Sequence, residues 1–302
     1  MTDCALTVKA TNSSCFAPDQ LTLITKYTDS NALAECKDDD KCMLEKSKLA
    51  DEVKEKIKRE AFKAPVESFD HNYWLNNTQI DTVMSQLRLK HPGFAHGFIH
   101  MIDLKSFSPT NVKSFDYPVH PVTEIDFSKE IAKALHEKGI IKDFSKVNET
   151  KLSTYDDTPL HSFGVICNTD SSKGSGQHWF TIFISTDQKD PDDTSKPWIR
   201  IECFNSGGGS SDNEEFNAFW EKTASEISKE TGLKCTYDTI TYLAHQSSDT
   251  GNCGSYSLFY IYSRLNGVHP DEFNNPKKPI KDYAMQKFRK VCFRIDKEDN
   301  IF

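Results

Sequence analysis

The sequence predicts an α+β fold in which helices flank a central sheet. Three runs rich in β-branched and aromatic residues, at 163–167, 179–184 and 198–204, are typical of buried strands. Within the third run, alternation places its apolar side chains on one face. Helical spacing of apolar residues follows in segment 216–227. Strands and helices together predict an α and β core.

The first 66 residues show helical patterns, and we expect residues 1–66 to form an arm beside a core over residues 67–302. One short helix is predicted after Pro18, and a longer charged helix over residues 41–62. The apolar stripe of that longer helix consists of Leu49, Val53 and Ile57. So narrow a stripe is expected to dock on a partner or on the core, without forming a core of its own.

The remaining elements of the core follow from periodicity, caps and turn residues. Asp212 is expected to cap the helix over 216–227, which ends at Gly232. Polar loops are predicted on either side of the second strand run. The further expected elements are helices at 81–89, 127–138 and 256–262, and a strand at 235–243.

Length and charge limit the class of protein. A chain of 302 residues can bury a substantial core. Its net charge of -8 argues against a protein that binds nucleic acid over its whole surface. Membrane-length apolar runs and a signal-peptide start are not seen in the sequence, so we expect an intracellular protein that does not enter a membrane.

The nine cysteines are scattered and odd in number, so reduced thiols are the expectation for a chain of this size. Neither a Cys-x-x-Cys pair nor a histidine cluster accompanies them, which argues against a zinc site. We predict no metal and no organic cofactor.

One cysteine stands out by its position. Cys253 lies between Asn252 and Gly254, directly before the predicted helix at 256–262. The partial positive charge of a helix N-terminus stabilises a thiolate, the nucleophilic form of cysteine. The Cys253 N–H and the Gln246 side-chain amide could together bind an oxyanion. The alternative is a small core residue, which is the usual fate of a free cysteine.

His178 begins the second strand run, and Asn205 follows the third. If these strands are neighbours, Asn205 reaches His178 and can orient its ring toward a thiol, as a Cys-His pair requires. Singly, His178 could be a surface histidine and Asn205 a turn residue. Asp212 or Glu202 would be the next candidates for the orienting residue.

In this order, His178-Trp179, Asn205, Gln246 and Cys253-Gly254, the chain resembles the adenain and ubiquitin-like-protease superfamily of papain-like cysteine peptidases. The resemblance implies a papain-like core with a central mixed sheet. The segment Trp74-Leu75-Asn76 is similar to the start of the catalytic domain in SUMO-specific proteases, although Asn77 replaces the aspartate found there. It implies that Trp74 and Asn76 contact substrate.

Asparagine at position 205 and the run after Asn252 are most similar to the polyprotein-processing proteases of large DNA viruses such as African swine fever virus. That resemblance implies cleavage after Gly-Gly in Gly-Gly-X sites of viral structural polyproteins, at assembly sites in the host cytoplasm and in the virion. It also implies that Trp179 roofs a tunnel that only glycine passes. The alternative is a Trp179 buried in the core.

Three other functions remain open. A cellular protease that deconjugates SUMO or ubiquitin-like proteins would use the same residues, and an acyltransferase of this superfamily would share the Cys-His pair. A binding module without activity is disfavoured, because all four site residues are present. Activation by a nucleic acid or a peptide has no support in the sequence.

Overall fold

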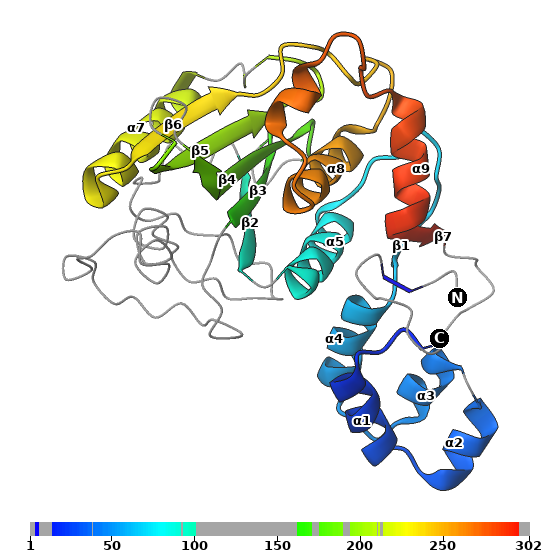
Figure 1. Cartoon of the computed structure of the whole chain (residues 1–302). Coiled ribbons are helices and arrows are strands. Elements are labelled where there is room, and N and C mark those ends of the chain that lie inside the picture. The colour runs from blue at the N-terminus through cyan, green and yellow to red at the C-terminus, as the bar shows by residue number, and fades with distance from the viewer. Residues whose placement is uncertain are drawn as a thin grey trace. The chain divides into compact units, whose positions relative to one another are not determined.

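Figure 1 shows the computed structural model, which describes residues 4–5, 14–37, 39–91, 93–100, 162–170, 175–189, 194–209, 211 and 214–295. The chain divides into two compact units, Met1–Lys90 with Gln286–Phe302, and His91–Met285. The arm over residues 1–66 and the core over residues 67–302 stay predictions, since these units have other bounds. The helix expected at 127–138 and the cap at Asp212 lie outside the described residues.

The second unit contains a five-stranded mixed sheet in the order β2-β3-β4-β5-β6. Strand β4 is antiparallel to both β3 and β5, whereas β2 with β3 and β5 with β6 are parallel pairs. The expected α+β class with a mixed sheet is confirmed. The strands are β2 (Phe94–His100), β3 (Ser162–Asn168), β4 (Trp179–Lys189), β5 (Pro197–Phe204) and β6 (Lys234–Thr239).

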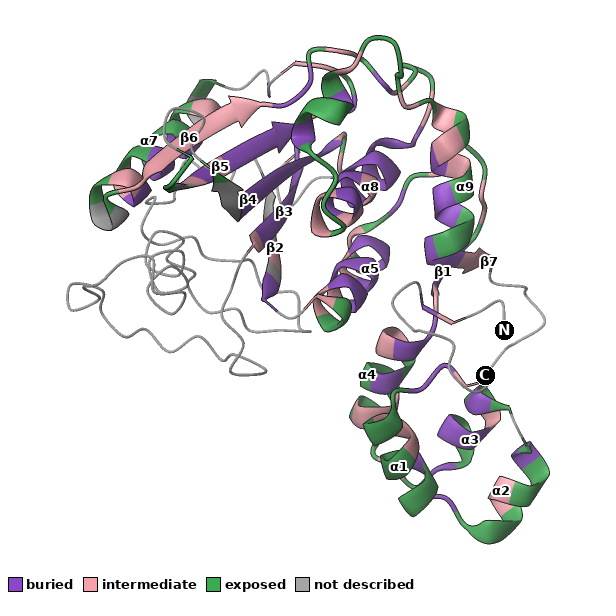
Figure 2. Cartoon of the chain, viewed as in Figure 1, coloured by how far each residue is buried: buried purple, intermediate pink, exposed green. Residues whose placement is uncertain are grey.

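One face of this sheet is apolar. Ile199, Ile201 and Cys203 of β5 share a buried cluster with Trp220 of α7 (Glu214–Thr231), so the predicted apolar face of the third strand is confirmed. Alternation along β5 sends the side chains between them to the opposite face. Figure 2 shows β5 buried over most of its length.

The opposite face is covered by α8 (Cys253–Leu265), whose polar residues meet those of the sheet. The Thr181 hydroxyl of β4 donates to the Ser257 carbonyl of α8 over 3.3 Å. The rings of Phe204 and Tyr260 stack with centroids 4.4 Å apart. The second turn of α8 therefore lies against β4 and the end of β5. After α8 come η2 (Pro270–Asn274) and α9 (Asp282–Cys292).

The first unit contains short helices and a small parallel strand pair, β1 with β7. Among its described residues, the first helix after Pro18 forms as predicted. The helix expected at 81–89 forms too and begins earlier, at Asn77. The elements are α1 (Pro18–Lys26), α2 (Ser30–Cys36), α3 (Asp40–Lys46), α4 (Asp51–Ala61), β1 (Ala64–Val66), α5 (Asn77–Lys90) and β7 (Phe293–Ile295).

The prediction of a single helix over residues 41–62 is wrong, because residues 47–50 between α3 and α4 are not helical. Ser47 ends α3 with an extended backbone, and its hydroxyl donates to the Leu44 carbonyl over 2.7 Å. The next N–H, of Lys48, donates to the Tyr27 carbonyl over 2.7 Å. Because this bond goes to a residue 21 positions earlier, the Lys48 N–H does not continue the helix. The apolar periodicity of segment 41–62 carries no sign of so distant a partner.

The expectation that all thiols are reduced is also wrong for the first four cysteines. Cys4 pairs with Cys15 and Cys36 with Cys42, and the paired Cα atoms lie 5.1 and 5.4 Å apart. These bridges border a core that the stripe argument did not foresee, because four short helices share it. Its buried members are Cys15, Phe16, Ile24, Cys36, Met43, Leu44, Ile57, Ala61 and Phe62.

Across the described part of the chain, no helix has both the length and the apolar composition of a membrane span. In the same residues, no three His, Cys, Asp or Glu side chains gather as the ligands of a metal ion would.

Candidate active site

His178 and Asn205 meet at one edge of the sheet. His178 directly precedes β4 and Asn205 directly follows β5, and the antiparallel register pairs Thr181 with Phe204. The strand ends therefore bring the two residues together, and His178 Nε2 lies 2.9 Å from Asn205 Oδ1. This is the contact expected if the strands are neighbours.

Hydrogen-bond chemistry fixes which nitrogen of His178 carries the proton. The Gly207 N–H donates to Asn205 Oδ1 over 2.9 Å, and a backbone N–H can only donate, so the atom at that place is the amide oxygen. That oxygen can only accept, so His178 Nε2 is the donor. In the neutral ring Nδ1 is then the basic nitrogen, the form that a general base needs.

Cys253 is the first residue of α8, as predicted, and follows the N-cap residue Asn252. The bond between Thr181 and Ser257 holds the start of the second turn of α8 against β4, which begins one residue after His178. The Cys253 side chain is buried, with 1% of its surface exposed. Because a core cysteine would also be buried, exposure does not separate the two interpretations, and the role of Cys253 as nucleophile stays a prediction.

The four other free cysteines are poor nucleophiles at neutral pH. Burial raises the pKa of Cys203 to about 11 and that of Cys235 to about 12. Burial also raises the pKa of Cys167 and of Cys292. These thiols stay protonated, and the thiolate is the reactive form.

Gln246 lies on the loop after β6 and is held at both ends of its amide. The Ser206 hydroxyl donates to Gln246 Oε1 over 2.8 Å, and Gln246 Nε2 donates to the Thr250 carbonyl over 2.6 Å. The main chain is held as well, because the N–H groups of His245 and Gln246 donate to the Ser206 carbonyl over 2.8 and 3.0 Å.

Glycine at position 208 allows the loops after β5 and β6 to approach closely. Gly208 has φ +87°, and a Cβ atom there would lie 3.0 Å from the Ala244 nitrogen and 3.0 Å from the Leu243 carbonyl carbon. The next N–H, of Gly209, donates to the Thr241 carbonyl over 2.9 Å. Any side chain at 208 would push the loop that carries Gln246 away from Asn205.

Asp282, the first residue of α9, organises the loop before Cys253. Its carboxylate accepts from the Ser247 N–H at 3.0 Å, the Thr250 hydroxyl at 3.2 Å and the Asn252 amide at 2.7 Å. Burial acts to raise the pKa of Asp282, but these hydrogen bonds outweigh it and the pKa is lowered. Sequence reasoning missed this residue, whose only local signal is an acidic residue at a helix start.

Of the predicted substrate residues, Trp179 is the first residue of β4, where it pairs with Asn168 and is buried. Trp74 and Asn76 belong to the first unit. Trp74 is 49% exposed. Asn76 caps α5. The Asn76 side chain accepts from the Gln79 N–H, and the Gln79 side chain accepts from the Asn76 N–H, each at 3.0 Å. Contact of these three residues with substrate stays a prediction.

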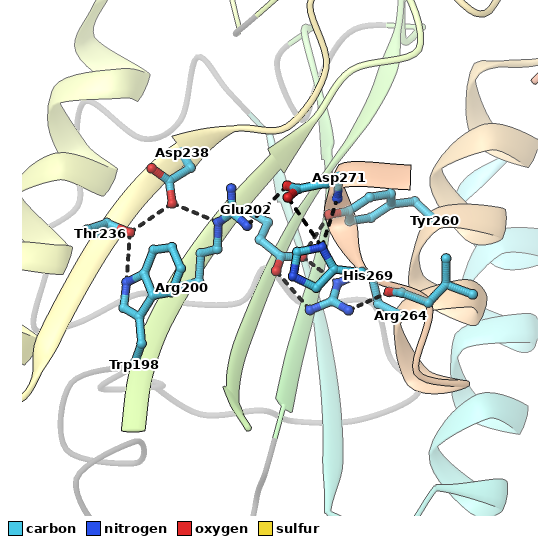
Figure 3. Close-up of polar contacts among 10 residues, drawn as sticks. Trp198, Arg200, Glu202, Thr236, Asp238, Tyr260, Arg264, His269 and Asp271 are labelled. Carbon is cyan, nitrogen blue, oxygen red and sulfur yellow. Dashed lines mark hydrogen bonds and ion pairs between the residues drawn. The ribbon is translucent and has the colours of Figure 1, made fainter. Parts of the chain in front are cut away.

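Glu202 is engaged away from His178 and does not serve as the orienting residue. Figure 3 shows its carboxylate among Tyr260 and Arg264 of α8. The Tyr260 hydroxyl donates over 2.7 Å, and Arg264 donates through Nε at 2.7 Å and Nη2 at 2.9 Å. Burial and the Glu202 charge raise the pKa of Tyr260 well above its usual value, so it remains a donor. Asp212, the other alternative, lies outside the described residues.

Comparisons with known proteins concern the family and the fold of this chain. A family model described as the Ulp1 protease family, C-terminal catalytic domain, matches residues 124–300. A cysteine protease of African swine fever virus, strain Badajoz 1971 Vero-adapted, is 37% identical over 139 residues. A protein named SUMO-1 cysteine protease, from isolate Pig/Kenya/KEN-50/1950 of that virus, matches equally. Each match covers 45% of both chains, so the chain spans about half the length of the curated relatives it matches.

A solved structure extends the likeness in fold. The crystal structure of a protease from the same virus superposes with a TM-score of 0.60 at 23% identity, covering 97% of this chain and 96% of that one. At this identity the likeness concerns the fold. The family match spans more than half of the 302 residues and includes His178, Asn205, Gln246 and Cys253. The chain therefore belongs to the Ulp1 protease family of cysteine proteases.

Proposed function

We propose that this protein is a cysteine endopeptidase with Cys253 as nucleophile and a Cys-His-Asn triad. The observation that carries the proposal is the bond between Asn205 Oδ1 and His178 Nε2, which leaves Nδ1 as the basic nitrogen of the ring. Cys253 begins α8, whose N-terminus favours a thiolate. Membership of the Ulp1 protease family supports the same reaction.

In the first half of the reaction, His178 Nδ1 takes the thiol proton and the sulfur attacks the peptide carbonyl carbon. As the S–C bond forms, an electron pair moves onto the carbonyl oxygen, which the Cys253 N–H and Gln246 Nε2 stabilise. Collapse of this intermediate breaks the C–N bond, and His178 returns its proton to the leaving amine. Water then gives a proton to His178 and attacks the thioester carbon, the C–S bond breaks to release the carboxylic acid, and the sulfur regains the proton from His178.

For the substrate we propose viral structural polyproteins, cut after Gly-Gly at assembly sites in the host cytoplasm and in the virion. Support comes from the resemblance of the Asn205 and Cys253 segments to viral processing proteases, and from relatives that are viral. We propose Trp179 as the residue that admits only glycine before the cut. Cleavage of SUMO precursors is a second candidate, because several relatives carry SUMO-1 cysteine protease in their names.

Peptides that end in Gly-Gly-X, Ala-Ala-X and Leu-Gly-X, together with a SUMO precursor, test both candidates in one assay. We expect the wild type to cleave the Gly-Gly peptide and Cys253→Ala to cleave none. Cys235→Ala is the matched control, since its thiol is half-buried, protonated and on β6. Trp179→Ala should relax the demand for glycine. Turnover by Cys253→Ala would refute the mechanism, and a SUMO precursor cut in preference would select the second candidate.

A further inference from the structure

We propose that Ser206 is a positioning residue that fixes the direction of the Gln246 amide, so that one amide N–H points at the carbonyl oxygen under attack. The inference deepens the proposed function and rests on it, because Gln246 matters there only as a donor to the oxyanion. Ser206 does not touch the reacting atoms, and its effect passes through Gln246.

The orientation of the amide follows from the chemistry of its two neighbours. The oxygen and nitrogen ends of a glutamine amide have almost the same shape, so only its partners distinguish them. A backbone carbonyl accepts and cannot donate, so the end that lies 2.6 Å from the Thr250 carbonyl is the nitrogen. The oxygen end then lies 2.8 Å from the Ser206 hydroxyl, which donates to it.

Two anchors at opposite ends of the amide define its plane, whereas one anchor would let it swing. If the Ser206 hydroxyl were removed, the Thr250 carbonyl would still hold the nitrogen, but the oxygen end could rotate about that contact. Ser206 is 1% exposed, so water does not readily replace its hydroxyl. The Ser206 carbonyl also accepts from the Gln246 N–H, which holds the same residue by its main chain.

The held amide keeps one donor for the substrate. Gln246 Nε2 carries two hydrogens, and one of them goes to the Thr250 carbonyl. Among the described residues no acceptor is recorded for the other, and the side chain is only half-buried. A developing oxyanion would supply that acceptor, and donors fixed before the reaction stabilise it without reorganisation.

Ser206 also couples the base to the oxyanion donor, because it follows Asn205 directly. Asn205 orients His178, and the next residue orients Gln246. Consecutive residues of one loop thus set both halves of the site, and Gly208 lets that loop approach the one that carries Gln246.

The test is a double-mutant cycle on cleavage of the Gly-Gly peptide by the full-length chain. We expect Ser206→Ala to lower kcat about tenfold with KM within about twofold, because a misplaced donor costs less than a deleted one. Gln246→Ala should lose about a hundredfold. In the Gln246→Ala background, Ser206→Ala should change kcat less than about twofold, since its target is gone. Ser206→Thr, which keeps the hydroxyl, should restore most of the rate.

Two controls separate positioning from a general defect. Ser263→Ala removes a similarly buried hydroxyl further along α8 and should leave kcat unchanged. Alkylation of Cys253 develops no oxyanion, so Ser206→Ala should be alkylated at the wild-type rate. If Ser206→Ala fails to fold, Ser206→Cys replaces it, because a thiol is a weaker donor of similar size and should give an intermediate loss.

Wild-type kcat in Ser206→Ala, or in Ser206→Cys where that variant is used, would overturn the inference. An equal loss in the wild-type and Gln246→Ala backgrounds would overturn it too, because Ser206 would then act without Gln246. Absence of cleavage by the wild type would instead overturn the proposed function. Full kcat in Gln246→Ala would overturn the role of Gln246 as the oxyanion donor.

Discussion

Two polar clusters lie between the region of β5 and α8. They differ in whether a hydrogen-bonding group is left for a substrate. The site cluster contains His178 with Asn205 and Ser206 with Gln246, to which our proposal adds Cys253, the first residue of α8. The ion-pair cluster contains Glu202, Tyr260 and Arg264, further along the same helix.

The ion-pair cluster is closed. Both oxygens of Glu202 accept hydrogen bonds from Tyr260 and Arg264, and the carboxylate is fully buried. In the site cluster, by contrast, one amide hydrogen of Gln246 is not used by the contacts described. Asn205 Oδ1 accepts a hydrogen bond from His178 Nε2. Two hydrogen bonds hold the Gln246 amide, and its second N–H can donate to substrate. Hydrogen-bonded polar side chains thus give stability in one place and, in our proposal, catalysis in the other.

Changes in the site cluster should reduce activity and spare stability. We expect His178→Ala to lower kcat/KM about a thousandfold, because it removes the general base. Asn205→Ala should lose less, since it removes orientation alone, and Asn205→Asp should retain substantial activity because a carboxylate also accepts the ring N–H. Peptide hydrolysis and thermal melting measure the two effects. Wild-type activity in Asn205→Ala would place the orienting residue elsewhere.

A change in the ion-pair cluster should do the reverse. Glu202→Gln leaves the Arg264 charge buried without a counter-charge, and should lower the free energy of unfolding by about 3 kcal/mol. Asp238→Asn is the matched control, because the Asp238 pair with Arg200 of β5 is partly exposed and should contribute about 1 kcal/mol or less. Urea unfolding compares the two variants. A larger loss in Asp238→Asn would contradict the contrast between closed and open clusters.

The disulfides of the first unit should matter to neither cluster. Removal of the Cys36 to Cys42 bridge by paired Ala substitutions should lower the local opening free energy of α2 and α3 by about 2 kcal/mol. Hydrogen exchange of the helix amides measures it. The amides of β4 and β5 should keep wild-type protection, and faster exchange there would show that the bridges support the sheet as well.

The sequence predicted the elements whose evidence is local. Strands β3, β4 and β5 and helices α7 and α8 carry their own periodicity. The contact of His178 with Asn205 followed from where two neighbouring strands begin and end.

The elements that escaped prediction depend on partners far along the chain. The break before α4 is set by a bond from Lys48 to Tyr27, and the disulfides by the packing of several short helices. Asp282 meets Asn252 across 30 residues. Glu202 carries no local sign that Arg264, 62 residues later, neutralises it. The catalytic and substrate roles are predictions for assays of activity and of thiol reactivity.

Alkylation of the native protein tests most directly whether Cys253 is the activated nucleophile. Iodoacetamide is added near pH 7, and peptide mapping by mass spectrometry follows the five free cysteines. The account predicts that Cys253 reacts first, about tenfold or more ahead of the others, and that His178→Ala slows this reaction. Earlier modification of Cys167, Cys203 or Cys235, whose burial raises their pKa, would contradict it.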